Sequence, residues 1–294
     1  MSHLMVNEYL RRKYGRKIYK LSINAGFSCP NRDGTCGTGG CIFCSGAGSG
    51  DFACEAFVPI GEQIRLAKEK AAEKGAEGYI AYFQAFTNTY APVETLKRRY
   101  SEAMEDPEIV GISVATRPDC LPPETVSLLS EMNRIKPVWV ELGLQTIHEK
   151  TAGYIRRGYP LSVYDKAVND LESAGLYVIT HVILGLPFET RKQMLETVKY
   201  VGNSGVQGIK LQLLHVIKGT DLEKEYLSGK FETMSFEEYV ALVRDCVAAL
   251  PEDVVIHRLT GDGAKKTLVS PLWSADKKRV LNALKKELSG LLTI

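Results

Sequence analysis

Six short apolar runs alternate with helical patterns along most of this chain, and this alternation restricts the fold more than any other feature. Most of the runs have four to eight residues and are rich in Val, Ile and aromatic residues, as buried strands are. They cover residues 18–24, 79–83, 109–115, 138–144, 178–184 and 209–216. The helical patterns between them cover residues 64–74, 93–104, 124–132, 163–174 and 191–201.

Alternating strands and helices pair in parallel through right-handed crossovers. We therefore expect an α/β fold, either a doubly wound sheet or a complete or partial barrel, with ligands at the carboxyl ends of the strands. The final segment is expected to add a helix, a strand and a closing helix at residues 236–250, 254–259 and 276–288. The simplest division gives a basic N-terminal helix at 1–16, a barrel at 17–230 and a helical extension packed on it at 231–294.

Composition excludes several classes of protein. An apolar fraction of 45% with 24% charged residues is ordinary for a globular protein, and it argues against disorder. The sequence has no apolar run of about 18 residues, and its N-terminus lacks the apolar stretch of a secretory signal. We expect a soluble cytoplasmic protein with no membrane partner. Seven cysteines are an odd number, which favours metal or cluster binding over a disulfide framework.

A glycine-rich loop with cysteines directly follows the first predicted strand. Eight of the 26 glycines fall within residues 26–50, which favours left-handed turns and close approach of the backbone to a bulky group. Cys41 and Cys44 form a C-x2-C chelate, and eleven residues separate Cys29 from Cys41. A structural zinc site would normally need a second chelating pair. Three thiolates suit a 4Fe-4S cluster whose fourth iron stays open.

Further motifs follow at successive predicted strand ends. They are Cys29-Pro-Asn-Arg-Asp-Gly34, Gly39-Gly-Cys-Ile-Phe-Cys44, Gly48-Ser-Gly-Asp-Phe52, Ala81-Tyr-Phe-Gln-Ala-Phe-Thr-Asn-Thr-Tyr-Ala-Pro92, Thr116-Arg-Pro-Asp119, Glu141-Leu-Gly-Leu-Gln145, Arg157-Gly158, Gly185-Leu-Pro187, Lys218-Gly-Thr220 and Thr260-Gly-Asp-Gly263. With these motifs the sequence resembles the radical S-adenosylmethionine (SAM) superfamily, in particular its small bacterial branch similar to the radical domain of the Elongator catalytic subunit.

The resemblance implies a partial (βα)6 TIM-like barrel with a small C-terminal extension. It also implies two cofactors, S-adenosyl-L-methionine and a 4Fe-4S cluster held by Cys29, Cys41 and Cys44. Reductive cleavage of SAM at the open iron would yield a 5'-deoxyadenosyl radical. A fourth thiolate would close that iron, so we interpret Cys36 as a bystander. The remaining cysteines are interpreted as small buried hydrophobic residues, namely Cys54, Cys120 and Cys246.

The resemblance also assigns residues around SAM. Phe43 is expected to shield the cluster, Arg157 to pair with the SAM carboxylate, and the other cofactor-binding candidates are Gln84, Asn88, Glu141, Gln145, Val182, Leu184 and Gly185. The catalytic residues stay unassigned. Candidates on the substrate side are His181, His215 and Lys218, although a lone histidine in a strand is more often a core residue.

Both ends of the chain are basic, since residues 1–24 and 257–294 each have a net charge of +5. Clustered lysine and arginine with interleaved aromatic rings favour RNA, whose phosphates bind cations and whose bases stack. The RNA-binding candidates are Arg11, Arg12, Lys13, Arg16, Lys17, Lys265, Lys266, Trp273, Lys277, Lys278 and Arg279. A solvated basic face is an equally open interpretation.

The resemblance implies tRNA, not DNA, as the partner, because Elongator-type radical domains act on the wobble uridine. The 294 residues leave no room for the acetyltransferase domain of the Elongator subunit. We therefore expect the step of the small bacterial relatives, from 5-carboxymethylaminomethyl-uridine to 5-aminomethyl-uridine, with flavodoxin or ferredoxin as electron donor. Three alternatives stay open: a radical SAM enzyme with a small-molecule substrate, a non-catalytic iron-sulfur or zinc RNA-binding module, and an electron-transfer protein.

Overall fold

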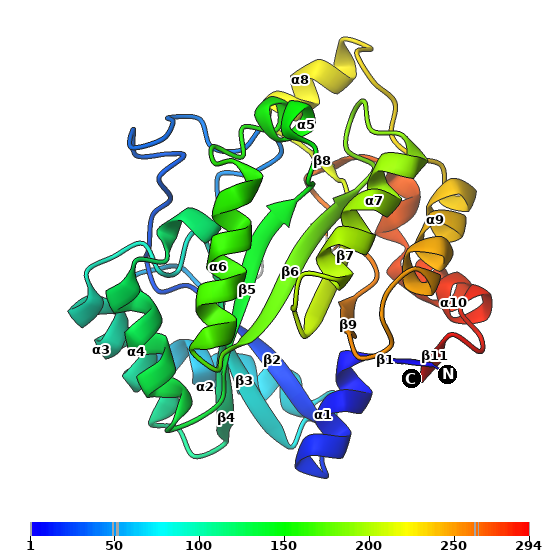
Figure 1. Cartoon of the computed structure of the whole chain (residues 1–294). Helices are drawn as coiled ribbons and strands as arrows, with labels where there is room; N and C mark the ends of the chain where they lie inside the picture. Colours follow the sequence, from blue (N-terminus) through cyan, green and yellow to red (C-terminus); the bar gives the residue numbers. More distant parts are fainter. Residues whose placement is uncertain (1, 49, 51–52, 262, 264, 294) are drawn as a thin grey trace.

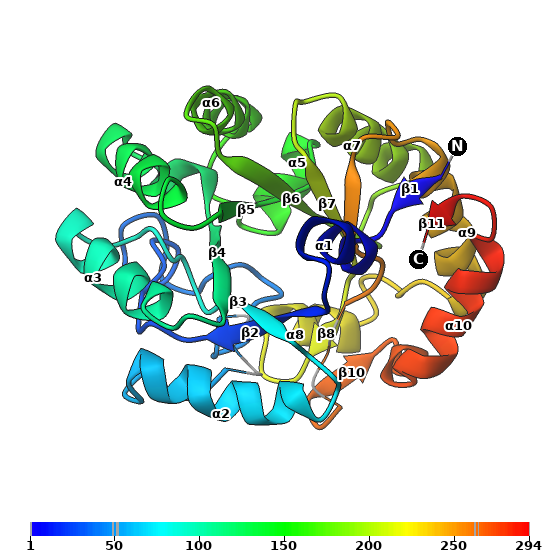
Figure 2. The ribbon, with the colours of Figure 1, turned by 90° about the horizontal axis from the view of Figure 1, so that it is seen from below.

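A curled parallel sheet forms the centre of the molecule. The computed structural model describes residues 2–48, 50, 53–261, 263 and 265–293. Within this part, seven strands pair in parallel in the order β2-β3-β4-β5-β6-β7-β9. Their bounds are Ile18–Ile23, Gly78–Phe83, Ile109–Thr116, Val138–Gln145, Tyr177–Leu184, Gly208–Leu213 and Val255–Arg258. The sheet curls into a half-barrel, as Figures 1 and 2 show, so the predicted fold class is confirmed.

Helices cover the outer face of this sheet. Those that connect or flank its strands are α2 (Ile60–Ala72), α3 (Val93–Met104), α4 (Pro123–Asn133), α6 (Leu161–Ser173), α7 (Arg191–Gly202) and α9 (Phe236–Ala248). Their apolar faces and the outward side chains of the strands form the main core. Two short helices, α5 (Glu149–Tyr154) and α8 (Asp221–Leu227), lie at the end of the half-barrel where its strands finish (Figure 1). No helix in the described part is long and apolar enough to span a membrane.

The C-terminal segment was predicted as a helical extension, but it also adds a strand to the central sheet. It contributes β9, which pairs with β7 as the seventh strand of the sheet, so the strands of the half-barrel exceed the six expected. Its other pieces are β10 (Leu268–Ser270), α10 (Lys277–Glu287) and β11 (Leu292–Thr293). The strand β10 pairs with β8 (Val216–Ile217), and β11 pairs with β1 (His3–Leu4). The chain ends therefore lie side by side (Figure 1).

The N-terminal helix α1 (Val6–Tyr14) closes the lower end of the half-barrel, where the strands begin (Figure 2). Its Leu10 is buried in a cluster with Ile18, Ile80, Trp139 and Ile179, which come from β2, β3, β5 and β6. Hydrophobic contacts therefore attach this helix to the sheet, although its sequence is strongly basic. The basic side chains face solvent at this lower end.

We expect Leu10→Ala to lower the free energy of unfolding by about 2 to 3 kcal/mol, because it removes a buried side chain and leaves a cavity beneath the barrel. Urea denaturation followed by circular dichroism measures the change. The matched control is Arg11→Ala, an exposed position on the same helix, which should change stability by less than about 0.5 kcal/mol. An unchanged midpoint for Leu10→Ala would show that α1 does not pack against the strands.

Candidate functional site

Three predicted cluster ligands line one large cavity. Cys29, Cys41 and Cys44 lie in the loop that follows β2, and all three border a cavity of about 1010 Å³ that continues into the half-barrel. Because this loop leaves the carboxyl end of β2, the thiols lie at the mouth of the barrel. Parallel α/β barrels bind their ligands at this end.

The thiol of Cys41 is partly buried and has a shifted pKa. Burial is the largest cause that raises the pKa of Cys41 to about 11, and the nearby thiols of Cys44 and Cys29 raise it further, while the Asn31 amide and Arg117 lower it. The Asn31 amide donates to the Cys41 sulfur at 3.5 Å. A bound metal would keep such a buried thiol deprotonated.

The described residues present no site for a single metal ion. Among the described residues, no group of three or more His, Cys, Asp or Glu side chains is close enough to hold one metal ion. An iron-sulfur cluster separates its ligand sulfurs more widely, because each sulfur binds a different iron. Gly48 lets the loop approach β3, since a Cβ there would lie 2.4 Å from the ring of Phe86. The donor set therefore fits a cluster with three thiolate ligands.

Backbone strain is concentrated at this mouth. Among the described residues, the non-glycine positions with positive φ are Phe86, Gln145, Arg156 and Phe188. Phe86 and Phe188 follow β3 and β6, and Gln145 ends β5. Such conformations cost free energy and persist where the surrounding structure imposes them, often at functional sites.

Gln145 also presents an unused acceptor. Its side-chain oxygen is buried, has no hydrogen-bond partner among the described residues, and belongs to a residue that lines the cavity. A buried acceptor without a partner costs free energy that a ligand can recover by donating a hydrogen bond. The amino and hydroxyl groups of SAM are such donors, so this residue fits the cofactor implied by the resemblance.

The other predicted SAM contacts differ in their surroundings. Gln84 and Arg157 line the cavity. The guanidinium of Arg157, however, donates to the carbonyls of Thr146 at 2.6 Å and Tyr159 at 2.9 Å. Asn88 is fully buried and donates to the carbonyl of Ala115 at 2.9 Å. Phe43 packs against the small core beside the cavity that contains Ile42 and Ile183. Their roles stay predictions.

The predicted adenine-binding positions on β6 need correction. The side chains of Val182 and Leu184 pack in the main core between sheet and helices, and Gly185 does not border the cavity. The neighbouring residues His181 and Ile183 line the cavity instead. Adjacent side chains of a strand point to opposite faces. The predicted residues therefore lie on the face of β6 that points away from the cavity.

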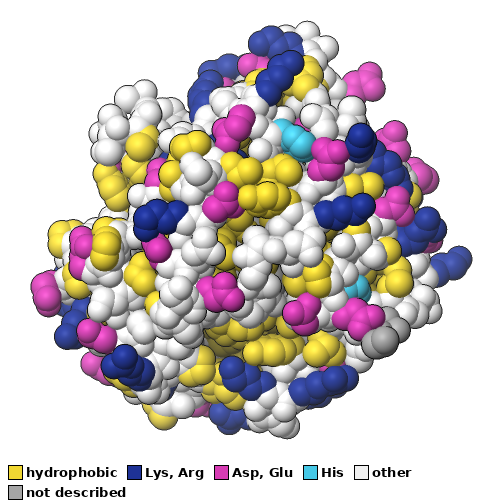
Figure 3. Space-filling model, viewed as in Figure 1, with side chains coloured by type: hydrophobic (Ala, Val, Ile, Leu, Met, Phe, Trp, Pro, Cys, Tyr) yellow, Lys and Arg dark blue, Asp and Glu magenta, His cyan; other side chains and the backbone are white. Residues whose placement is uncertain are grey.

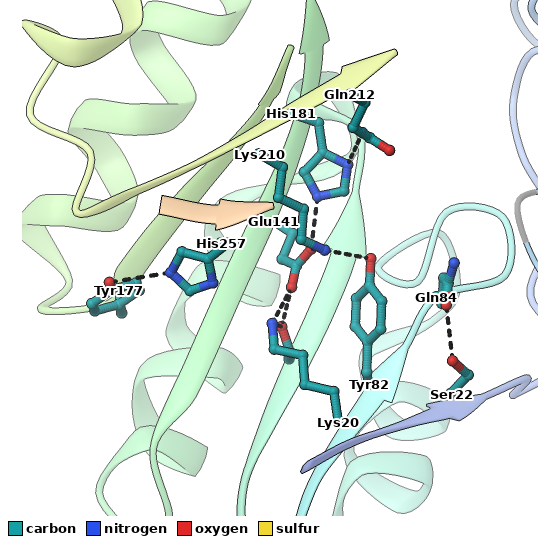
Figure 4. Close-up of polar contacts among 11 residues, drawn as sticks. Lys20, Ser22, Tyr82, Gln84, Glu141, Tyr177, His181, Lys210, Gln212 and His257 are labelled. Atoms are coloured by element: carbon teal, nitrogen blue, oxygen red, sulfur yellow. Dashed lines mark hydrogen bonds and ion pairs between the residues drawn. The ribbon is translucent and has the colours of Figure 1, made fainter. Parts of the chain in front are cut away.

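A buried charged cluster lies deeper in the same cavity (Figure 4). The Glu141 carboxylate is fully buried and accepts hydrogen bonds from Lys20 at 2.7 Å, Ser113 at 2.6 Å and His181 at 2.7 Å, and it also contacts Lys210. Although burial acts in the opposite direction, Lys20 and Lys210 hold the pKa of Glu141 well below its usual value. Both oxygens are thus occupied by protein groups, and the predicted contact of Glu141 with SAM stays a prediction.

The histidine in this cluster is neutral. Burial lowers the pKa of His181 to about 4, and Lys210 lowers it further, against the effect of Glu141. Its Nε2–H donates to Glu141, and its Nδ1 accepts from the Gln212 amide at 3.3 Å. The other substrate-side candidates are His215, which lines the cavity, and Lys218, which is exposed and lies outside it.

The four remaining cysteines differ in their burial. Cys120 and Cys246 are buried, as predicted. Cys54 is half-buried and lines the main cavity, so its interpretation as a core residue is wrong. Cys36 is exposed and borders a separate hollow next to Thr89 and Tyr90. Of the predicted motifs, Ser49, Asp51, Phe52 and Asp262 lie outside the described residues.

The predicted RNA-binding residues lie in separate places. Those of the N-terminal run are exposed beneath the barrel, at the end opposite the cysteines. Lys277 of α10 lines the cavity, whereas Lys265, Lys266, Lys278 and Arg279 are exposed and do not border it. The prediction that Trp273 stacks on RNA needs correction, because its ring packs on Phe236 and Tyr239 and its N–H donates to the Met234 carbonyl at 3.0 Å.

Sequence reasoning missed Lys20, Lys210 and Tyr82, which line the cavity around Glu141. The two lysines could have been noticed in the sequence, because a lysine within an apolar strand is unusual unless its charge is paired. Lys20 stands in Ile-Tyr-Lys-Leu-Ser-Ile and Lys210 in Gly-Ile-Lys-Leu-Gln-Leu.

Comparisons with known proteins agree with this geometry. The family model of the radical SAM superfamily matches residues 31–201, and that of the radical SAM C-terminal domain matches residues 206–289. The chain is 48% identical over 286 residues to the uncharacterized protein YtqA of Bacillus subtilis, covering 97% of this chain and 89% of that protein. It is 28% identical over 168 residues to Elongator complex protein 3 of Schizosaccharomyces pombe, covering 56% of this chain and 30% of that protein.

A solved structure has a similar fold. The Elp3 protein of the archaeon Methanocaldococcus infernus superposes with a TM-score of 0.67 at 18% identity. The match covers 93% of this chain and 63% of the archaeal one. At this identity the likeness supports the fold alone, and the chain spans less than two thirds of that protein.

Proposed function

We propose, from the premise that this chain belongs to the radical SAM superfamily, that it is an enzyme that modifies tRNA at the wobble uridine. The cofactors of the family are S-adenosyl-L-methionine and a 4Fe-4S cluster, and together they supply a carbon radical that abstracts hydrogen from a substrate. In this chain Cys29, Cys41 and Cys44 would hold the cluster. The residues of the half-barrel would orient SAM and the substrate and exclude water.

One observation carries the choice of a polyanionic substrate. Three lysines line the same cavity as the three cysteines: Lys70 of α2, Lys74 just beyond the end of α2, and Lys277 of α10. In Figure 2 these helices flank the half-barrel on the side between its edge strands β2 and β9. On the face in Figure 3, by contrast, basic and acidic side chains are interspersed around apolar ones. A phosphate backbone approaching the open side would therefore meet cations that border this cavity.

The similarity to Elongator proteins supports the wobble uridine as target, and we propose the conversion of 5-carboxymethylaminomethyl-uridine to 5-aminomethyl-uridine. The substrate would lose two electrons to SAM, which would leave as methionine and 5'-deoxyadenosine. Water would then cleave the C–N bond and release the two-carbon unit as glyoxylate. A flavodoxin or ferredoxin would supply the one electron that primes the enzyme, because the second electron lost by the substrate would replace it in each turnover.

The test is an anaerobic assay with reconstituted protein, dithionite and SAM, with and without tRNA that carries the carboxymethylaminomethyl group. We expect 5'-deoxyadenosine to rise with tRNA, and equal amounts of glyoxylate and 5-aminomethyl-uridine to appear. The double variant Lys70→Glu, Lys277→Glu should raise the KM for tRNA at least about tenfold and reduce its salt dependence. Lys192→Glu, at a strongly exposed position on α7, is the charge-matched control. Formation of 5'-deoxyadenosine without any tRNA effect would redirect the search to small molecules.

A further inference from the structure

The charged cluster inside the half-barrel has more cations than its carboxylate can pair. Lys20 and Lys210 both contact Glu141, and His181 is neutral, so these four groups have one positive charge in excess. Lys210 and Glu141 are almost completely buried. Arg258 lies close enough to lower the pKa of both lysines. An excess of buried positive charge is costly unless an anion enters.

The cluster faces the cavity and is not closed off in the core. Lys20, Tyr82 and Lys210 line the same cavity as the three cysteines, together with Glu141, His181 and Gln212. The Lys210 ammonium also donates to the Tyr82 hydroxyl at 3.1 Å. The two ammonium groups and the phenol therefore border a cavity that also extends to the cysteines at the mouth.

The depth of the cluster separates it from the SAM carboxylate. Glu141 precedes Gln145 by four residues on β5, which corresponds to about 13 Å along a strand. The resemblance places the SAM carboxylate on the open iron at the mouth. We therefore expect an anion at the lysines to belong to another molecule.

We propose that Lys20 and Lys210 form a binding site for a carboxylate carried by the substrate. This inference rests on the proposed function, because the carboxymethyl arm of the modified uridine ends in a carboxylate on a flexible chain. One carboxylate would balance the excess charge of Lys20, Lys210 and Glu141. Tyr82 would donate its hydroxyl hydrogen to the second oxygen, since a phenol can act as donor as well as acceptor.

A tryptophan beside the site provides a readout that requires no tRNA. The Lys20 ammonium lies 4.7 Å from the centre of the Trp139 ring. The chain has two tryptophans, so Trp273→Phe leaves Trp139 as the single reporter. The cluster-loaded protein in this background is titrated with acetate, with its neutral analogue acetamide and with inorganic phosphate. The pH is kept below about 7, the pKa of Lys210, which burial lowers.

We expect a saturable change of Trp139 fluorescence with acetate and none with acetamide. Lys210→Met should weaken acetate binding at least about tenfold, the loss expected for a charged hydrogen bond, and Lys210→Arg should retain it. Lys20→Met, at a more exposed position, is a second variant if Lys210→Met does not fold by circular dichroism. Equal responses to acetate and acetamide, or binding of phosphate alone, would overturn the carboxylate site.

The same variants separate this inference from the proposed function. If acetate binds through Lys210 but tRNA nucleosides stay unchanged in the anaerobic assay, the carboxylate site stands and the tRNA substrate is wrong. If tRNA is modified but Lys210→Met leaves acetate binding and the KM for tRNA unchanged, the function stands and the carboxylate site is wrong.

Discussion

Cys41→Ala is expected to abolish the iron-sulfur absorbance after reconstitution and to reduce 5'-deoxyadenosine formation by more than about 100-fold. Loss of a residue in the outer shell of a metal site already costs about 10- to 100-fold, and removal of a ligand should cost more. The effect should be large because the Cys41 sulfur, held by the Asn31 amide and next to the Arg156 carbonyl, is one of only three predicted ligands. The measurements are the visible spectrum, the iron content and the yield of 5'-deoxyadenosine.

The matched control is Cys36→Ala in the same loop. Cys36 is exposed and borders a different hollow, so this variant should keep the cluster spectrum and the yield of 5'-deoxyadenosine within about twofold. Cys54→Ala is a second control, because Cys54 lines the cavity but is not one of the three predicted cluster ligands. Loss of the cluster in Cys36→Ala together with its retention in Cys41→Ala would reverse the assignment of ligands.

The strands and helices of the sheet could be predicted because local pattern determines them. The run at 138–144 corresponds to β5, Val138–Gln145, and the helical pattern at 93–104 corresponds to α3, Val93–Met104. The role of α1 could not be predicted, since its many charges conceal a single buried Leu10 and the cluster beneath the barrel forms only when four strands come together. Membership of β9 in the sheet is likewise a long-range property.

Site residues that lie close together in the sequence could be predicted from their spacing. Site residues that come together only through the pairing of distant strands could not. Cys41 and Cys44 are separated by two residues, so their spacing alone predicts a chelate. Val182 and Ile183 lie in an apolar strand that is buried on both faces, and such a run does not show which residues point inward. The partners of Glu141 are 69 and 121 residues away, at Lys210 and Lys20. They meet only through the register of the sheet.

Glu141→Gln is expected to lower the free energy of unfolding by about 3 to 5 kcal/mol near neutral pH, because it leaves two lysines in the barrel without their anion. Urea denaturation measures the loss. Glu108→Gln is the matched control, since Glu108 pairs with Lys68 at the surface and is mostly exposed, so it should cost at most about 1 kcal/mol. A loss for Glu141→Gln no larger than the control's would show that the lysines do not depend on this carboxylate.

The pH dependence of Glu141→Gln follows from two lowered pKa values, each of which makes stability rise with pH in its own range. Lys20 and Lys210 hold the pKa of Glu141 well below 4.5 in the folded chain, so its stabilisation is present above that pH and is lost as the pH falls further. The difference between wild type and variant should shrink on acidification. Burial lowers the pKa of Lys210 from 10.5 to about 7, so the unfolded chain binds more protons between these values and stability rises with pH there. Without the Glu141 charge the pKa of Lys210 falls further, and this rise should begin at a lower pH.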